Sequence, residues 1–567
     1  MRPSLRQAFP FLLLTLTLSA CATSRTAAPA AAPAPAREEG ARTAVLLAVN
    51  DIYRIEGVEN GTAGDLARLR TLRADLEGEA PDLLMFHAGD LLSPSFLSRS
   101  YRGQQMIDVM NLLDGDPDGF DRRFFVVFGN HEFDRDDLSD APLLDQRVEE
   151  SQFNWVNGNV VFGQDADGKP LVDAPNLAPT YLAESGGIRF GIFGLTTDIK
   201  HPAYVDRFAD PVATARQLTA ELRAKGAEVV IALTHLDRND DLALLEKLGD
   251  AGPDLILGGH DHDRMILKAS NGRQVLKADS DARTATVVRI TRHRDGRLDV
   301  RGEHVALSGD TPRRDPVVQA RVDAWLARHE KEFCAKTQEP PGCLETVLGR
   351  TRTAFVAEEN KIRSRETSAG DWLADLMLQA YAPCGAQAAF VNSGSLRLNQ
   401  DLAPDTELTR ESLEELFGFP APLHLIRIDG RTLQEAADHA VQSPGTGAWL
   451  QVSGIAYTDG TDVADLKSRK AGRLTLLTPQ EARPVRPDES ILVVVPEYLI
   501  DPTDNQDGFT MLSAKQEVKD CSVGSADLKK LAQTALKAAE PQGIAPVTDG
   551  RICPAAGGSV CKAVLSR

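Results

Sequence analysis

The sequence lacks an apolar segment long enough to cross a membrane. The apolar core near the N-terminus is too short for an ordinary span, and no later stretch reaches the roughly 18 uninterrupted apolar residues that predict a transmembrane helix. It also lacks an excess of basic residues, because 63 lysines and arginines stand against 82 aspartates and glutamates, which gives a formal net charge of -19. This balance argues against a nucleic-acid polymer as partner, since such binding draws on basic surface. A small anion remains compatible with the sequence if one site supplies local positive charge.

The N-terminus has the pattern of an exported, lipid-anchored protein. Two arginines precede the apolar stretch FPFLLLTLTLSA, and Cys21 follows directly, as in a bacterial lipoprotein signal peptide. Cys21 would be the lipidated first residue of the mature chain, and Ala22 lacks the charge associated with inner-membrane retention. We therefore expect an outer-membrane lipoprotein of the cell envelope that faces the periplasm or the surface. Residues 22–42 are Ala/Pro-rich and have no face to bury, so they predict an extended spacer.

Cysteine is missing from the rest of the first half of the chain. The six further cysteines are Cys334, Cys343, Cys384, Cys521, Cys553 and Cys561. An even number in an exported chain favours disulfides over metal thiolates or a cysteine nucleophile. The first two and the last two would close short loops and leave Cys384 with Cys521. Six cysteines nevertheless allow fifteen connectivities, and the sequence does not choose among them.

Five apolar, strand-like runs in the N-terminal half each end in a cluster of possible metal ligands. These runs are TAVLLAVND, DLLMFHAGD, FFVVFGNHE, EVVIALTH and DLILGGHDH. Helix-like segments such as GDLARLRTLRADLEG lie between several of them, which predicts an α/β domain. In such sheets, ligands and catalytic groups gather at the carboxyl ends of the strands. We therefore expect the five clusters to converge on one site.

The spacing inside two clusters indicates which side chains face that site. Residues two apart on an extended chain point to the same side, so His260 and His262 can face one site while Asp261 points away. By the same geometry Asp51 and Tyr53 point together.

The other three clusters supply single ligands. Asn130 and His131 are adjacent, so one should face a metal ion and the other whatever the metal holds. Asp90 follows its strand in AGD, where a carboxylate can bridge two cations, and His235 ends the run IALTH.

Taken in order across residues 51 to 262, these motifs resemble those of the calcineurin-like metallophosphoesterases. The stretch GNHEFD, followed by NWVNGNV, resembles the 5'-nucleotidase family in particular. The resemblance covers residues 43 to about 545. It implies an α/β fold with a four-layer α/β/β/α metallophosphoesterase domain and a smaller α/β substrate-binding C-terminal domain.

The N-terminal pattern and this resemblance together predict the domain organisation. We expect a signal peptide (1–20), a lipidated cysteine and linker (21–42), a dinuclear metallophosphoesterase domain (43–310), a linking helix and hinge (311–350), a 5'-nucleotidase C-terminal domain (351–550) and a tail (551–567).

The resemblance implies two metal ions that share one carboxylate. The ligands would be Asp51, Asp90 and His262 for the first ion, and Asp90, Asn130, His235 and His260 for the second. Such oxygen and imidazole ligands suit Mn, Zn or Fe, as divalent or mixed-valence ions. Two cations about 4 Å apart would clamp a phosphate and generate hydroxide from bound water. His131 would stabilise the transition state or protonate the leaving oxygen, with Asp134 orienting its imidazole.

Tyr53 departs from the family pattern, which usually has histidine at this position. As a phenolate it could replace the imidazole, because a bound cation favours deprotonation and a hard anionic oxygen suits an ion such as ferric iron. Alternatively Tyr53 is not a ligand and water fills the gap, or the weakened site binds without turnover.

The second half carries matches to the substrate-binding domain of the family. The residues that would hold a nucleotide are Arg363, Asn392, Arg397, Trp449, Tyr498 and Asp507. Arginine offers a forked donor to phosphate oxygens, and flat rings stack on a base. The two aromatic residues could instead be core residues, and the arginines surface pairs. The family's NGGG is NSGS here and its GGDG is NQDG, so the base or nucleoside can differ.

These observations predict an exported, lipid-anchored, monomeric phosphohydrolase that acts on nucleotides, nucleotide sugars or cyclic nucleotides. One alternative is a phosphatase, or a relative of the thiosulfate-processing sulfohydrolases, acting on another small anion. Another is a nucleotide-binding lipoprotein that has lost turnover. The intact GNHEFD and GHDH motifs favour an enzyme, whereas Tyr53 favours the binding protein.

Overall fold

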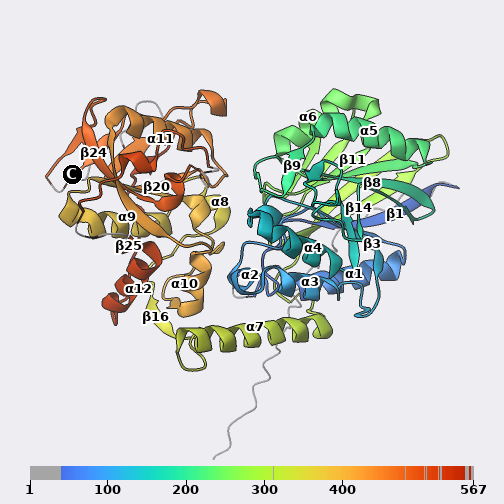
Figure 1. Cartoon of the computed structure of the whole chain (residues 1–567), viewed down its shortest axis with the longest axis horizontal. Coiled ribbons are helices and arrows are strands. Elements are labelled where there is room, and N and C mark those ends of the chain that lie inside the picture. The colour runs from blue at the N-terminus through green and yellow to red at the C-terminus, as the bar shows by residue number, and fades with distance from the viewer. Residues whose placement is uncertain are drawn as a thin grey trace, which may run out of the picture.

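Two lobes joined by one long helix make up the described part of the chain (Figure 1). The computed structural model describes residues 40–59, 61–310, 312–478, 480–502, 505, 507–521, 523, 526–555 and 561–562. The predicted signal peptide and Cys21 lie outside these residues. The expected linking helix is present as α7 (Pro316–Thr337). Among the described residues, no helix combines the length and the apolar character needed to cross a bilayer.

Two sheets packed face to face form the N-terminal domain. The first has the order β15-β14-β1-β2-β3-β4-β6 and the second the order β12-β13-β11-β10-β8-β7. The first sheet comprises β1 (Arg42–Val49), β2 (Leu84–His87), β3 (Asp121–Val127), β4 (Phe153–Val156), β6 (Leu177–Ala178), β14 (Thr284–Arg292) and β15 (Leu298–Ala306). The second comprises β7 (Thr180–Ser185), β8 (Ile188–Thr196), β10 (Val229–His235), β11 (Leu255–Gly258), β12 (Met265–Lys268) and β13 (Gln274–Lys277).

Helices cover the outer face of each sheet. One outer layer contains α1 (Leu66–Glu79), α2 (Phe96–Tyr101), α3 (Gln104–Met110) and α4 (Ala141–Glu149), and the other contains α5 (Pro211–Ala224) and α6 (Arg238–Leu248). Strand β1 shows why its sequence is a continuous apolar run: Leu46 packs between the sheets, while Leu47 packs under the first helical layer. A strand buried on both faces needs apolar residues in both directions. The predicted four-layer α/β/β/α architecture is confirmed.

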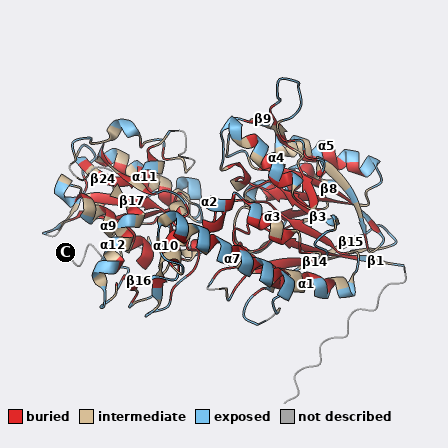
Figure 2. Ribbon diagram, turned by 60° about the horizontal axis from the view of Figure 1, so that its bottom comes forward, coloured by how far each residue is buried: buried red, intermediate tan, exposed pale blue. Residues whose placement is uncertain are grey.

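The C-terminal domain is built on a five-stranded sheet with the order β20-β17-β24-β19-β25. Its strands are β17 (Ala388–Asn392), β19 (Pro422–Asp429), β20 (Leu450–Ser453), β24 (Ser490–Pro496) and β25 (Ala526–Asp527). The helices are α8 (Glu359–Ile362), α9 (Ser368–Tyr381), α10 (Arg410–Leu416), α11 (Gly430–Gln442) and α12 (Leu528–Ala539). One core packs α11 on the sheet and a second packs α9 and α12 on the opposite face. Figure 2 shows the buried residues following the strands of both domains.

Smaller strands complete the C-terminal half. A four-stranded sheet has the order β23-β22-β21-β26, with β21 (Ile455–Thr458), β22 (Thr475–Leu477), β23 (Ala482–Pro484) and β26 (Ile552–Cys553). Two pairs stand apart, β16 (Val347–Arg350) with β18 (Glu407–Thr409), and in the N-terminal half β5 (Val160–Phe162) with β9 (Val205–Phe208).

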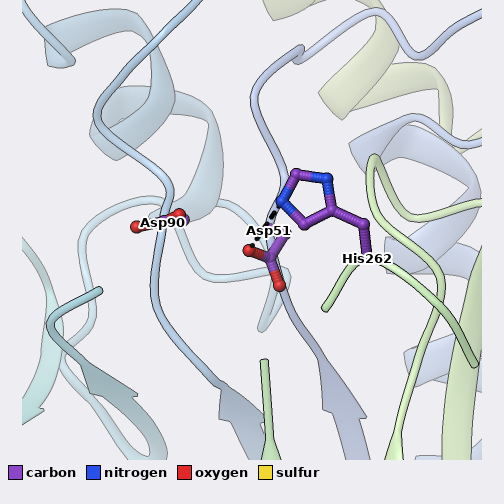
Figure 3. Close-up of side chains that lie close together, drawn as sticks. All are labelled: Asp51, Asp90 and His262. Carbon is purple, nitrogen blue, oxygen red and sulfur yellow. Dashed lines mark ion pairs between the residues drawn. The ribbon is translucent and has the colours of Figure 1, made fainter. Parts of the chain in front are cut away.

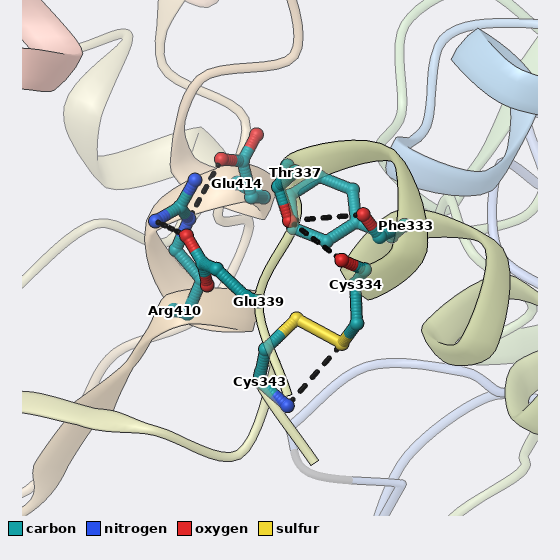
Figure 4. Close-up of a disulfide and its surroundings, with 7 residues drawn as sticks. All are labelled: Phe333, Cys334, Thr337, Glu339, Cys343, Arg410 and Glu414. Atoms are coloured by element: carbon teal, nitrogen blue, oxygen red, sulfur yellow. Dashed lines mark hydrogen bonds and ion pairs between the residues drawn. A yellow bond between two sulfur atoms is a disulfide. The ribbon is translucent and has the colours of Figure 1, made fainter. Parts of the chain in front are cut away.

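Three disulfides bond the six cysteines of the second half. The bonds join Cys334 with Cys343, Cys384 with Cys521, and Cys553 with Cys561. This is the pairing that the two short loops favoured among the fifteen possible ones. The first disulfide closes the turn that leaves α7, close to the pair that Glu339 forms with Arg410 of α10 at 3.4 Å (Figure 4). The end of the linking helix is thereby tied to the C-terminal domain.

Candidate metal centre

The predicted metal ligands converge at the carboxyl ends of β1, β2, β3, β10 and β11. Strands β1, β2 and β3 run parallel, as do β10 and β11, so their ends meet at one edge. Asp51, Asp90 and His262 each place a ligand atom within 4.8 Å of the others (Figure 3). The Nε2 of His262 lies 3.2 Å from Oδ1 of Asp51. This group is the one predicted for the first ion.

The ligands predicted for the second ion lie on the other side of Asp90. The Nε2 of His235 is 3.2 Å from Oδ2 of Asp90 and 3.2 Å from Oδ1 of Asn130. The Nδ1 of His260 is 3.1 Å from the same Asn130 oxygen. Asp90 therefore stands between the two groups, where a bridging carboxylate would lie.

Tyr53 points into the first group. Its hydroxyl oxygen lies 2.9 Å from Nε2 of His262, 3.1 Å from Oδ2 of Asp90 and 3.4 Å from Oδ1 of Asp51. The expectation that Asp51 and Tyr53 point together is confirmed. Burial raises the pKa of Tyr53 well above its ordinary value, and the charges of Asp90 and Asp51 raise it further. The phenol therefore keeps its proton until a cation balances these carboxylates.

The backbone at the strand ends has positive φ angles, which residues other than glycine rarely adopt. Asp51, Asp90 and His262 have φ values of 52°, 59° and 61°. Such residues cost about 1–3 kcal/mol each and persist where the surroundings over-determine them, commonly at functional sites. Gly129 makes room for this arrangement, because a Cβ there would lie 2.1 Å from Oδ1 of Asp90.

Two of the predicted histidine ligands are oriented by a partner at the second ring nitrogen. The carbonyl of Ala88 lies 2.7 Å from Nδ1 of His235, which leaves Nε2 for the site. For His262 the corresponding partner is Glu359, whose carboxylate lies 2.7 Å from Nδ1. Burial lowers the pKa of His262, but Glu359 and Asp51 raise it to about 10.

Asp261 points away from the cluster, as the two-residue spacing predicts. Its carboxylate lies 2.5 Å from Nζ of Lys277 and 2.7 Å from Nε of Arg238. The ion pair between Asp261 and the buried Lys277 thus fixes the loop that carries His260 and His262, on the side away from the cluster. Nothing in the sequence pattern marked Lys277 for this task.

His131 and Asp134 form the contact that the resemblance implied. The Nδ1 of His131 lies 2.9 Å from Oδ2 of Asp134, and Lys200 lies 3.0 Å from the same carboxylate. Burial opposes ionisation of Asp134, yet His131 and Lys200 hold its pKa well below the usual range. The backbone N–H of His131 also donates to Asp90 at 2.7 Å, which fixes its place beside the cluster.

Glu132 is a site-building residue that sequence reasoning missed. Its buried carboxylate accepts backbone N–H groups from Asp90 at 2.9 Å, Leu91 at 2.7 Å and Leu92 at 3.0 Å, and from Gly129 at 2.5 Å. One side chain therefore joins the loops that follow β2 and β3. Its place in GNHEFD was the available signal, but three of its four donors come from a segment some forty residues away.

Four of the six predicted substrate residues lie together in the C-terminal domain. The amide of Asn392 donates to Asp507 at 2.8 Å. Burial raises the pKa of Asp507, while Asn392 and the charges of Arg363 and Arg397 act in the opposite direction. Both arginines are thus close enough to Asp507 to act on its charge.

The prediction that Trp449 stacks on a base is wrong for this structure. Its ring is 2 % exposed and packs in the core between α11 and the sheet, with the indole N–H unpaired. The core alternative left open by the sequence applies. Tyr498 is half-buried at the edge of the same core. An exposed ring that the sequence did not single out is Phe419, which lies under the Arg397 guanidinium at 5.7 Å.

The two domains meet at the metal-ligand cluster. The guanidinium of Arg54, from the N-terminal domain, donates to the carbonyl of Arg397 at 2.7 Å and pairs with Glu415 at 3.3 Å. Tyr53 and Arg397 line the same small pocket at this interface. The predicted phosphate-binding residues thus face the predicted metal ligands.

The donor set of the cluster fits metal ions. Two buried carboxylates, three imidazoles, an amide and a phenol converge here, and buried charges of one sign need a cation to balance them. The fold places this cluster at the carboxyl ends of the strands in a two-domain α/β protein. Together they define the class of metal-dependent phosphoesterases.

Comparison with known proteins gives the family. Residues 44–264 match the calcineurin-like phosphoesterase family, and residues 347–514 match the C-terminal domain of 5'-nucleotidases. The chain belongs to the 5'-nucleotidase family of calcineurin-like phosphoesterases, and it is a hydrolase of phosphate esters.

Individual relatives extend over most of the chain. The 5'-nucleotidase of Rattus norvegicus is 25% identical over 532 residues, which cover 86% of this chain and 85% of the relative. The solved structure of a 5'-nucleotidase precursor from Thermus thermophilus superposes with a TM-score of 0.73 at 24% identity, covering 90% of this chain and 99% of that one. A sulfate thiohydrolase from Thermus thermophilus shares the fold at a TM-score of 0.66 and 15% identity, over 90% of this chain and 96% of its own.

Proposed function

We propose that the protein is an exported, lipid-anchored, monomeric 5'-nucleotidase that hydrolyses nucleotides, nucleotide sugars or cyclic nucleotides with two metal ions. The observation that supports this best is the meeting of two groups at one interface. Arg397 and Arg363 come from the C-terminal domain, and the carboxylate and imidazole cluster comes from the N-terminal domain. A nucleotide whose phosphate is held by these arginines has its phosphorus beside the cluster. The anchor would be Cys21, which lies outside the described residues.

The residues proposed to hold the two ions are Asp51, Tyr53, Asp90, Asn130, His235, His260 and His262. When bound, such a pair of ions supplies a nucleophile at neutral pH and stabilises the in-line displacement at phosphorus. His131 offers its Nε2 to the leaving oxygen, because Asp134 occupies its Nδ1 at 2.9 Å. Asp134 thereby keeps the imidazole in the orientation in which it can hold and release a proton.

We propose Tyr53 as a metal ligand, and its position is the support. Its hydroxyl oxygen lies within 3.4 Å of a ligand atom of each of the three residues predicted for the first ion. A cation there would offset the carboxylates that raise the pKa of the phenol. Among the three interpretations of Tyr53, this position favours a ligand over a bystander or an inactive site.

One experiment separates the proposed activity from its alternatives. Purified mature protein would be analysed for bound metals and assayed for phosphate release from AMP, UDP-glucose and an aryl phosphate. We expect two equivalents of metal and release from the nucleotides. Turnover of the aryl phosphate alone would favour a general phosphatase. Two bound metals without phosphate release from any of the three substrates would favour the sulfohydrolase alternative. Fewer than two metals and no turnover would leave a binding protein.

The role of Tyr53 has its own readout. If iron is present, a visible charge-transfer band should disappear in Tyr53→Phe. With a colourless metal, Tyr53→Phe should weaken the first ion's affinity, and Tyr53→His, which restores an imidazole donor, should recover it. Two equivalents of metal with unchanged affinity and turnover in Tyr53→Phe would remove Tyr53 from the ligands.

A further inference from the structure

One side chain of the C-terminal domain reaches into the metal-ligand cluster of the N-terminal domain. Glu359 begins the short helix α8, and its carboxylate is 2 % exposed. Its Oε2 lies 2.7 Å from Nδ1 of His262, and its Oε1 lies 2.5 Å from Arg363 one helical turn later. A buried carboxylate paired on both sides is held in one orientation.

The contact decides which nitrogen His262 offers to the site. The carboxylate beside Nδ1 accepts a hydrogen bond from that nitrogen, so Nε2, which lies 3.2 Å from Asp51 and 2.9 Å from Tyr53, is the nitrogen available to an ion. Such a partner on the second nitrogen orients a metal-binding imidazole and raises its basicity. The Nδ1 of His235 has a corresponding partner within its own domain, the carbonyl of Ala88.

The two histidines therefore differ in where their support comes from. The support of His235 is present in the N-terminal domain whatever the other domain does. The support of His262 exists only while α8 lies against the loop after β11. A movement of the C-terminal domain by a few ångström would break a 2.7 Å contact and leave the imidazole without this anchor.

We propose that Glu359 is a positioning residue that couples the arrangement of the two domains to metal binding at the first site. The inference rests on the proposed function, since it requires an ion at His262. With the domains together, Glu359 completes the support of that ion. Because coupling between two equilibria is reciprocal, ion binding in turn favours the arrangement with the domains together. Arg363, proposed to hold phosphate, pairs with the same carboxylate and so belongs to the same coupled unit.

The test compares two carboxylates that both cross the domain interface. Glu359→Gln keeps the shape but removes the charge beside His262, whereas Glu415→Gln removes the partner of Arg54 and touches no predicted ligand. Mn²⁺ or Zn²⁺ affinities of the full mature chain would be measured by competition with a chromophoric chelator. Loss of a partner behind a metal-binding histidine typically costs 10–100-fold in affinity. We expect that loss for one of two ions in Glu359→Gln, and affinities within about threefold of wild type in Glu415→Gln.

A double-mutant cycle separates positioning from a merely structural role. In a His262→Gln background, Glu359→Gln should have no further effect on metal affinity, because the residue through which it acts is gone. Equal losses in both backgrounds, or wild-type affinities for both ions in Glu359→Gln, would overturn the coupling. If the wild-type chain itself bound no metal and released no phosphate, the proposed function would fall together with this inference. Two ions bound with the same affinities in wild type and in Glu359→Gln would overturn the inference alone.

Discussion

The lysine behind the loop that carries two predicted metal ligands offers a sharp test of how the site is held. Lys277 is 1 % exposed, and its ammonium donates to the carbonyls of Leu236 at 2.6 Å and Gly259 at 2.8 Å. It also pairs with Asp241 at 2.8 Å and Asp261 at 2.5 Å. The substitution Lys277→Met keeps the length of the side chain and removes its charge. It leaves two buried carboxylates without their shared cation.

The expected magnitude follows from this geometry. Removing one partner of a buried ion pair costs about 3–5 kcal/mol, because an uncompensated charge stays buried. For a domain of this size each kcal/mol shifts Tm by roughly 2–4 °C, so Tm should fall by about 6–20 °C. Burial raises the pKa of Asp241, against the effect of Lys277. A raised carboxyl pKa favours the folded state at low pH, so without Lys277 the penalty should grow from pH 5 to pH 8.

Calorimetric unfolding at pH 5 and pH 8 would check both parts of this prediction. The matched control is Lys268→Met, which removes an exposed lysine from the neighbouring strand β12. The control should stay within about 1 °C of wild type, since surface substitutions rarely matter. A Lys277→Met protein with wild-type Tm at pH 8, or with a loss independent of pH, would refute the reasoning.

Three further predictions concern other parts of the structure. Glu132→Gln turns an amide group toward backbone N–H donors. The free energy of unfolding, measured by urea titration, should therefore fall by at least about 2 kcal/mol, and metal affinity should fall in parallel. Unchanged stability would contradict the role assigned to Glu132. Replacing both Cys384 and Cys521 by serine should cost about 2–5 kcal/mol, because their bond closes a loop of 137 residues, and equal stability of the oxidised and substituted proteins would contradict this. Burial raises the pKa of Glu56 to about 8 despite Arg54, so the stability that Glu56 contributes should be lost as pH rises from about 4.5 through 8. In Glu56→Gln the Tm should therefore depend less on pH in that window. Parallel curves of Tm against pH for wild type and Glu56→Gln would contradict this prediction.

The part of the fold and site that follows local chain geometry could be predicted. The two-residue spacing placed His260 and His262 in the cluster and turned Asp261 away, because alternation along extended chain is a local property. The ends of five apolar runs met because parallel strands align their carboxyl ends. The disulfide pairing was favoured by short loops, which is also local.

What the sequence could not supply depends on which segments pack against each other. Trp449 follows a turn into a strand whose sheet is buried on both faces, so its neighbours in sequence say nothing about which core its ring enters. Glu359 and His262 are 97 residues apart and in different domains, and no periodicity relates them. Buried charges such as Lys277 look like surface residues in sequence until their partners are known.

The net charge of -19 raises the question of how this protein attracts an anionic substrate. Local charge at the interface answers it. Arg54 belongs to one domain and Arg363 and Arg397 to the other, and they come together beside the metal-ligand cluster. Each domain alone carries only part of this positive charge, and the carboxylates of the cluster repel phosphate until ions balance them. Substrate binding should therefore require both bound ions and contact between the domains. Glu359 links these two conditions, because it belongs to the C-terminal domain and its carboxylate contacts His262 of the N-terminal domain.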